Sequence, residues 1–287
     1  MAFKFFNYDK AGPGISKNAP QKRKFIVFFE TFFRNIWKFM PINLVYFGVS
    51  LPIITNGLAT VGITHVVRNT ALDKHSFGLS DFFETIKKNW KQALSVGIIN
   101  TIITMIIACD FMFFHNYNGN SIFGTVGLGF SLFLAFTFAV MNFYIWTLMI
   151  TFNFTTTQLY KNSFKFVFLN LWKNALCLIL EVLMYAVYAL VGYIILHMSA
   201  NIVMMLLAVT MIVFVLTFPC YRALMIQYFV FPPIKKFIIE PYYKAHPFED
   251  IEKRRDLGLE IEELKRYDED GNLITDDEEL VFDDTVN

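Results

Sequence analysis

The sequence predicts an all-α polytopic membrane protein with about six transmembrane helices arranged as three hairpins. Two observations support this class. First, 55% of the 287 residues are hydrophobic and only 17% are charged, whereas a soluble domain carries about a quarter charged residues. Second, the apolar residues form three pairs of runs, and each pair follows a segment with the amphipathic pattern of an interfacial helix.

The charges divide the chain into a basic membrane body and an acidic tail. Residues 246–287 hold 16 Asp or Glu and 5 Lys or Arg, whereas residues 1–245 hold 8 and 20. We therefore expect a cytoplasmic lead over residues 1–24, a membrane domain over residues 25–231 and an acidic cytoplasmic tail over residues 232–287. No cleavable signal peptide is predicted, because the first 24 residues are polar and basic.

The distribution of Lys and Arg sets the expected orientation. These residues recur in the lead and between the hairpins, whereas the turns at 115–121 and 198–201 contain none. The positive-inside rule then places both termini in the cytoplasm and the chain in the cell membrane, with the lipid bilayer as its first partner.

The first hairpin, residues 39–72, is the shortest. Its outbound arm (39–54) and return arm (58–72) are separated by Leu51-Pro52 and Asn56-Gly57. Since a span needs about 20 residues, the arms either cross with the help of snorkelling Lys38 and Arg68 or form a re-entrant hairpin buried in protein. The ample length of the later spans favours the short spanning form.

The other two hairpins have longer arms. Spans are expected at 93–114 and 122–150, and again at 176–197 and 202–218, with the last continuing past Pro219 towards Phe231.

A Trp-Lys pair introduces each hairpin. The three pairs are Trp37-Lys38, Trp90-Lys91 and Trp172-Lys173. Indole rings and snorkelling lysines are favoured in the headgroup layer, so these residues are predicted to be interfacial anchors. Internal duplication and the need of every span for such anchors explain the repeat equally well.

Several stretches carry a family likeness: FFRNIWKFMPINLVYFGVSLPIIT, GLATVGITHVV and the connector FFETIKKNWKQA. Here the chain resembles the YesL-like family of small integral membrane proteins of Gram-positive bacteria, which is catalogued as a domain of unknown function. The likeness is most specific around Asn43, Leu51-Pro52, Thr55 and Gly57. The resemblance implies an accessory role in carbohydrate uptake beside ABC importers, and it supplies no catalytic residue.

Polar residues are concentrated in the first hairpin, where Pro52 removes a backbone donor. Asn43, Thr55 and Asn56 are expected to satisfy the carbonyls that the break sets free. A ligand cavity is the alternative, because broken helices also build transporter sites. Gly57 is expected to allow close helix packing.

Three ionisable residues within the predicted spans are candidates for function. Glu181 and Arg222 lie towards the inner ends of their spans and can pair, with a packing role favoured over chemistry. Asp110 lies one turn from the outer turn, where reaching water or capping the helix is favoured over binding a substrate or a proton.

The sequence contains no recognisable motif for catalysis, cofactor binding or metal binding. Cys109, Cys177 and Cys220 are predicted to be small buried hydrophobes. In the tail, the residues around Asp270-Gly271-Asn272 depart from a calcium loop, and we expect a turn there between short strands at Leu264–Tyr267 and Leu273–Thr275.

Two functional hypotheses follow, both for a non-enzymatic protein that does not bind nucleic acid. The first is an accessory or regulatory component that binds the subunits of a carbohydrate ABC importer. The second is a small-solute transporter with its site at the broken first hairpin.

Overall fold

The computed structural model of the chain describes residues 23–117, 122–197, 200–245, 266–267 and 273–274. Most of the predicted lead and most of the predicted acidic tail lie outside these residues. Contacts between residues divide the chain into two units, Met1–Phe229 and Val230–Asn287. All the helices that form the candidate site lie in the first unit or begin there.

Helices make up nearly all of the described chain. They are α1 (Lys24–Arg34), α2 (Ile36–Ser50), α3 (Asn56–Ala71), α4 (Leu79–Asn116), α5 (Ile122–Thr151), α6 (Thr156–Leu169), α7 (Leu171–Leu196), α8 (Ala200–Ile234) and α9 (Glu240–Ala245). A 3₁₀ turn, Ile53–Thr55, joins α2 to α3, and a five-residue π-helix, Lys235–Ile239, follows α8.

Four helical segments are long and apolar enough to cross a membrane: α4, α5, α7 and Ile202–Tyr243, which begins within α8. The chain is therefore a multi-pass membrane protein built almost entirely of helices. The helices of the first hairpin, α2 and α3, have 15 and 16 residues, and each is shorter than the roughly 20 residues of a full span. Six crossings therefore stay a prediction.

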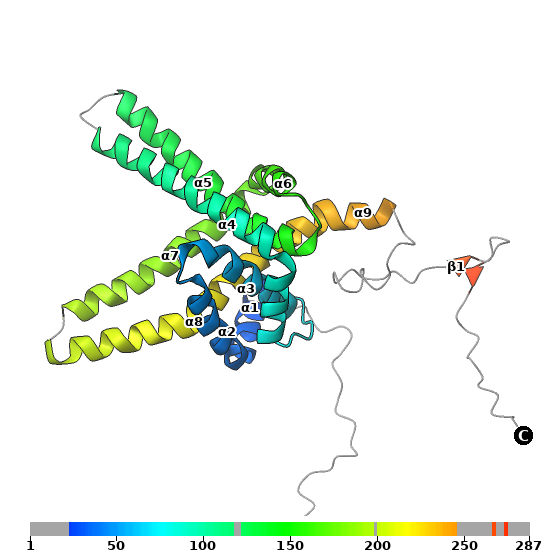
Figure 1. Cartoon of the computed structure of the whole chain (residues 1–287), viewed down its shortest axis with the longest axis horizontal. Coiled ribbons are helices and arrows are strands. Elements are labelled where there is room, and N and C mark those ends of the chain that lie inside the picture. Colours follow the sequence, from blue (N-terminus) through cyan, green and yellow to red (C-terminus); the bar gives the residue numbers. More distant parts are fainter. Residues whose placement is uncertain (1–22, 118–121, 198–199, 246–265, 268–272, 275–287) are drawn as a thin grey trace, which may run out of the picture. The chain divides into compact units, whose positions relative to one another are not determined.

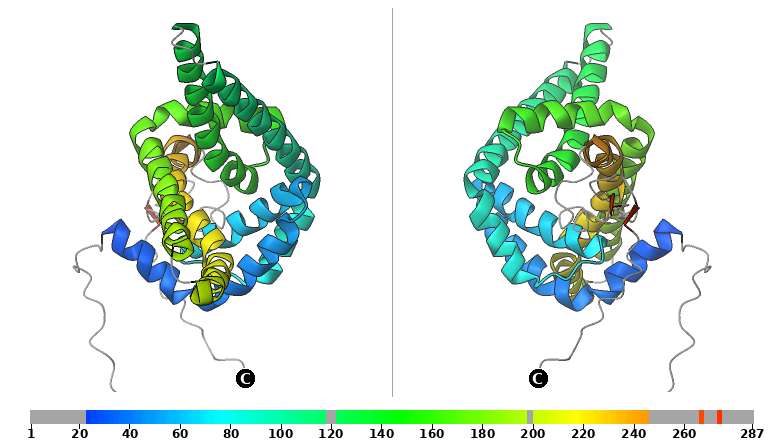
Figure 2. Two further views of the ribbon diagram at one scale, coloured as in Figure 1. Left: turned by 90° about the vertical axis from the view of Figure 1, so that its left-hand side faces the viewer. Right: turned by 90° about the vertical axis from the view of Figure 1, so that its right-hand side faces the viewer.

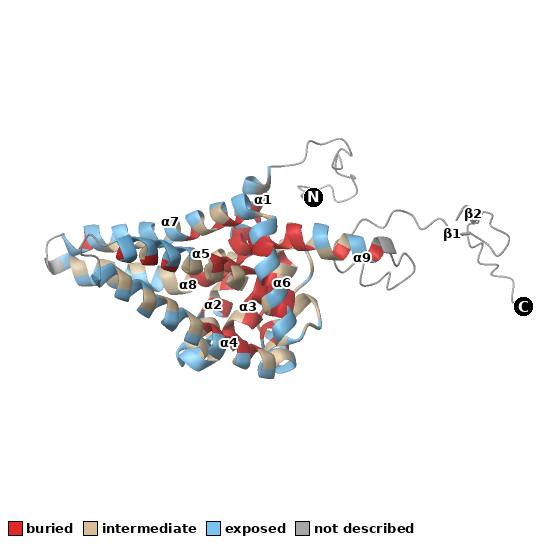
Figure 3. Ribbon diagram, turned by 90° about the horizontal axis from the view of Figure 1, so that it is seen from above, coloured by how far each residue is buried: buried red, intermediate tan, exposed pale blue. Residues whose placement is uncertain are grey.

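The two long hairpins, α4–α5 and α7–α8, extend away from the packed base of the first unit (Figure 1). Large apolar side chains such as Ile106 and Met204 are 62% and 77% exposed along them. Buried residues gather at the base, around α2 and α3 (Figure 3). An outward apolar surface of this kind is suited to lipid rather than to water.

The segments that precede the hairpins differ from one another. α1 and α6 are separate helices before α2 and α7, as expected. Thr155 begins α6 with a capping box, in which its hydroxyl accepts from the Gln158 N–H and the Gln158 side chain accepts from the Thr155 N–H. The second hairpin corrects the prediction of an interfacial helix before each hairpin. Residues 79–92 do not form a separate helix, because α4 runs unbroken from Leu79 to Asn116.

The helices α3 and α4 cross at a pair of glycines. A Cβ atom added to Gly57 would lie 2.3 Å from the carbonyl oxygen of Ala93 and 2.9 Å from the Cα atom of Gly97. The two backbones are therefore in direct contact, which only residues without a side chain permit. This crossing fixes which face of α4 is turned towards α3.

Replacing Gly57 by Ala is expected to destabilise the protein by about 1 to 3 kcal/mol, because backbone atoms would have to move apart. Gly48 on α2 is the matched control, since no atom lies within 4 Å of its added Cβ. Ala at that position is expected to stabilise the helix by up to about 1 kcal/mol. Thermal unfolding of both variants in detergent measures the difference, and equal shifts would contradict the close crossing.

The second unit contains a short antiparallel pair of strands, β1 (Arg266–Tyr267) and β2 (Leu273–Ile274). Arg266 lies opposite Ile274 and Tyr267 opposite Leu273. The predicted strands of the tail are confirmed in this shortened form, while the turn at Asp270-Gly271-Asn272 lies outside the described residues.

Candidate functional site

The first hairpin is broken where α2 ends. Pro52 adopts an extended conformation with φ −74° and ψ 123°. The Thr55 hydroxyl lies against two carbonyl oxygens near the break, those of Val49 and Pro52, the latter at 2.9 Å. Thr55 thus satisfies backbone groups that the end of α2 leaves without helical partners.

Asn43 on α2 is fully buried and joins the backbone of α8. Its amide nitrogen donates to the carbonyl oxygen of Leu216 at 2.6 Å, and its amide oxygen accepts from the N–H of Cys220 at 2.9 Å. Residues 216 and 220 are i and i+4 partners in a regular helix, so the Asn43 amide bonds to two backbone groups one turn apart on α8. Pro219, which has no N–H, lies at the same place. α8 runs unbroken through this point, and Asn43 ties it to α2.

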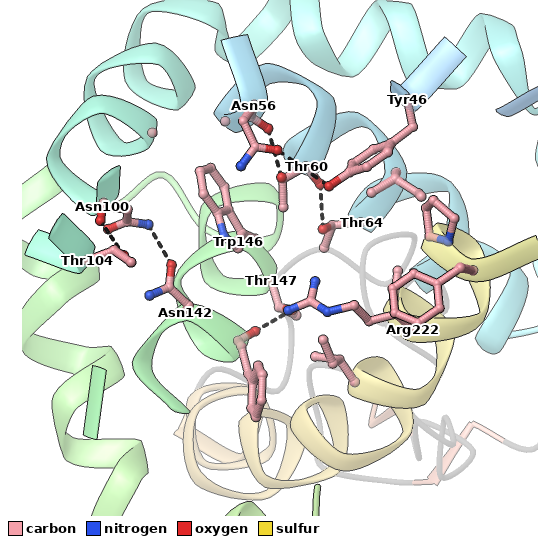
Figure 4. Close-up of a pocket in the computed structure, with 18 of the residues that line it drawn as sticks. Tyr46, Asn56, Thr60, Thr64, Asn100, Thr104, Asn142, Trp146, Thr147 and Arg222 are labelled. Atoms are coloured by element: carbon pink, nitrogen blue, oxygen red, sulfur yellow. Dashed lines mark hydrogen bonds between the residues drawn. The ribbon is translucent and has the colours of Figure 1, made fainter. Parts of the chain in front are cut away.

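A cavity of about 570 Å³ lies between the helices of the first unit. Figure 2 shows these helices arranged around a common centre. The lining comes from α2, α3, α4, α5, α7 and α8, and its polar members are Tyr46, Asn56, Thr60, Thr64, Asn100, Thr101, Thr104, Asn142, Trp146, Thr147, Tyr185, Arg222 and Gln227. Hydroxyls, amides and aromatic rings thus converge in the middle of an apolar bundle (Figure 4).

An amide network holds the α4–α5 side of the cavity. Asn100 donates to the Asn142 amide oxygen at 2.7 Å, and the Tyr160 hydroxyl on α6 donates to the Asn100 amide oxygen at 2.6 Å. Sequence reasoning missed these residues, because the spans at 93–114 and 122–150 are predicted from hydropathy alone. The available signal is one Asn within each run, Asn100 and Asn142, since buried amides in lipid must find partners.

The α5–α8 side contains an incompletely bonded amide. Gln227 is 2% exposed, and its nitrogen donates to the Thr147 hydroxyl at 2.9 Å. Its Oε1 atom is buried and accepts no hydrogen bond within the described part of the chain. A buried acceptor that lines a cavity without a protein partner points to a ligand or to water.

The predicted pair of Glu181 and Arg222 forms, joining α7 to α8 through the Arg222 Nε atom. The Glu181 side chain is 9% exposed, and Tyr185 also hydrogen-bonds to Arg222. Among the cavity-lining residues in the described ranges, Arg222 alone is charged. Because Glu181 pairs with it, the cavity wall carries little net charge.

The other predicted candidates lie elsewhere or have structural neighbours. Asp110 on α4 accepts a hydrogen bond from Ser131 on α5, so it joins these helices rather than reaching the cavity. Asn56 and Gly57 do line the cavity. Pro52 and Thr55 lie at the break and are not among the lining residues. Cys177 and Cys220 are buried as predicted, whereas Cys109 is exposed and corrects the prediction for that residue.

The predicted anchors are mostly exposed. Trp37, Trp90 and Trp172 are 80%, 50% and 87% exposed. Lys91 lies over the Trp90 ring at 5.6 Å, Lys173 is exposed and Lys38 is half-buried. Within the described ranges, no three His, Cys, Asp or Glu side chains gather as a metal-ligand group.

One comparison with known proteins gives a match. Residues 39–111 match the family model described as "Protein of unknown function, DUF624". The match covers 73 of the 287 residues. This agrees with the family resemblance noted from the sequence. No curated protein and no solved structure matches the chain.

The matched segment covers most of α2, all of α3 and most of α4. It therefore supplies the cavity residues from Tyr46 to Met105, including the glycine crossing. Helices outside the matched segment, α5, α7 and α8, complete the cavity.

Proposed function

We propose that this protein binds a small, uncharged polar solute in the cavity and moves it across the membrane without chemical change. The observation that carries the proposal is the cavity lining, which places amides, hydroxyls and aromatic rings inside an apolar bundle. Binding sites for small molecules combine such rings with a few convergent polar groups, in cavities of about 300 to 1,000 Å³. Polar groups are costly within a membrane unless they serve structure or a solute.

A broken hairpin and a proline-containing helix flank the cavity. The α2–α3 hairpin is broken at Pro52, and α8 contains Pro219, which itself lines the cavity. Discontinuous helices are typical of the sites of secondary transporters, because their free backbone groups and hinges lie beside the solute. This arrangement supports transport over passive structural packing.

Flux through the purified protein tests the proposal. Full-length protein in liposomes is expected to pass a panel of uncharged solutes that includes urea, acetamide and glycerol, as followed by vesicle swelling. Thr60→Trp should fill the cavity and reduce the swelling rate about tenfold or more. Thr217→Trp is the control, because Thr217 lies on α8 outside the cavity lining. Equal rates for the two variants, or rates no greater than in empty liposomes, would refute transport.

An accessory role in carbohydrate ABC import is the second candidate, which the resemblance of the sequence to the YesL-like family implies. In this role the cavity would bind the solute, and the bound protein would signal its presence to an importer. Affinity purification in mild detergent is the test. Stoichiometric recovery of permease and ATPase subunits, together with no flux by the purified protein alone, would support this role over transport.

We also propose that both termini face the cytoplasm of a cell membrane, as the positive-inside rule indicates. In a Cys109→Ser background, a cysteine at Tyr117 should react with a membrane-impermeant maleimide added to intact cells. A cysteine at His75 should not react. Both positions are exposed in the structure, so the reverse labelling pattern would contradict the orientation.

A further inference from the structure

Four threonines of α3 and α4 line the cavity: Thr60 and Thr64 on α3, and Thr101 and Thr104 on α4. We call them the threonine wall. Each hydroxyl donates its proton to a carbonyl oxygen of its own helix. The four distances run from 2.6 to 2.9 Å, with acceptors Asn56, Thr60, Gly97 and Asn100 in turn.

These internal bonds determine what the wall offers to a solute. A hydroxyl has one proton and two acceptor positions. Because each proton of the threonine wall is already donated within the helix, the wall presents oxygen lone pairs. The unpartnered Oε1 atom of Gln227 adds another acceptor to the same cavity. A solute that fills this space must therefore donate hydrogen bonds.

Donors lie elsewhere around the cavity. Asn56 accepts from the Tyr46 hydroxyl at 3.4 Å through its amide oxygen, and its amide nitrogen has no hydrogen bond within residues 23–117, 122–197 and 200–245. The Trp146 side chain lies across from Asn56 (Figure 4), and its indole N–H can only donate. The same solute must therefore also accept hydrogen bonds.

The charges around the cavity further limit the class of solute that it can bind. A cationic solute would meet Arg222, and an anionic solute would meet the acceptors of the threonine wall while competing with Glu181 for Arg222. An uncharged solute avoids both costs. Hydroxyl groups are the neutral groups that donate and accept at one atom.

We propose that the solute is a polyol, a compound with hydroxyl groups on neighbouring carbon atoms, which donates hydrogen bonds to the threonine wall. This inference rests on the proposed binding function and names the class of solute. The apolar faces of Trp146 and Phe143 lie in the same lining and suit the carbon chain between the hydroxyls.

Equilibrium binding tests the inference with full-length protein in detergent. Radiolabelled xylitol is the probe, and unlabelled glycerol, erythritol, xylitol and sorbitol compete with it. Xylitol with all five hydroxyls methylated is the matched competitor, because it keeps the oxygen acceptors and loses every donor. We expect saturable binding that at least one polyol displaces, and at least tenfold weaker competition by the methylated compound.

Variants test the wall itself. Thr60→Val keeps the shape of the side chain and removes the acceptor, and it is expected to weaken xylitol binding about threefold to tenfold, the value of one neutral hydrogen bond. Thr217→Val is the control. Its hydroxyl donates to the Val213 carbonyl oxygen at 2.7 Å, the same type of bond, outside the cavity lining. Binding should be unchanged in that variant.

Three results would overturn the inference: equal competition by the methylated compound, equal weakening by the two Val variants, or no binding of any polyol. The liposome measurement separates these from a failure of the proposed function. If Thr60→Trp still blocks flux of urea or acetamide while no polyol binds, the cavity conducts solute and only the polyol class is wrong.

Discussion

Replacing Asn43 by Leu is expected to lower the free energy of unfolding by about 1 to 3 kcal/mol. The substitution retains most of the buried volume but removes both hydrogen bonds to α8, those to the Leu216 carbonyl and from the Cys220 N–H. Each neutral hydrogen bond contributes about 0.5 to 1.5 kcal/mol. Thermal unfolding in detergent, followed by circular dichroism, measures the loss.

Asn89→Leu is the matched control. The Asn89 amide donates to the Thr85 carbonyl oxygen of its own helix at 3.0 Å and joins no second helix. Its replacement should change stability by less than about 1 kcal/mol. If the two variants unfold at the same temperature, the hydrogen bonds between Asn43 and α8 do not contribute to stability.

The second large effect is expected from Arg222→Met. The long apolar side chain keeps the packing but leaves the Glu181 carboxylate without its partner in a nearly buried place. Removing one member of a buried ion pair typically costs about 3 to 5 kcal/mol. The same unfolding measurement applies, and solute flux should fall as well, because Arg222 lines the cavity.

The double variant Glu181→Gln, Arg222→Met separates charge from packing. With no unpaired charge left, it should recover most of the stability lost in Arg222→Met, because the cost of that variant is mainly the desolvated carboxylate. A double variant as unstable as the sum of the two single variants would show that the pair acts through shape. The flux of the double variant then reports whether the charge itself is needed for the solute.

The sequence was sufficient to predict the class of fold and several local features. Hydropathy placed α5 and α7 to within a few residues, and the break at Pro52 was visible as a Pro within an apolar run. The Glu181–Arg222 pair could also be predicted, because charged residues are rare in spans and these two lie at similar depth. These features depend on local chemistry and on distance along a helix.

The cavity could not be predicted from the sequence in the same way. Its wall depends on which face of each helix turns inward, and for α4 that face is set by the contact of Gly57 with Gly97. The sequence does not show how α4 is rotated about its axis. It therefore does not show that Asn100 and Thr104 line a cavity together with residues of α3 and α5. The prediction of a separate interfacial helix before the second hairpin was wrong for a related reason. No residue between 79 and 92 ends the helix, so the amphipathic and apolar segments form one continuous helix.

The contact of Asn43 with α8 has a consequence for biogenesis. A ribosome completes α2 long before α8, so the Asn43 amide has no bond to the Leu216 carbonyl or the Cys220 N–H until α8 is made. A polar side chain in the earliest part of the membrane domain therefore waits for the last long helix to satisfy it.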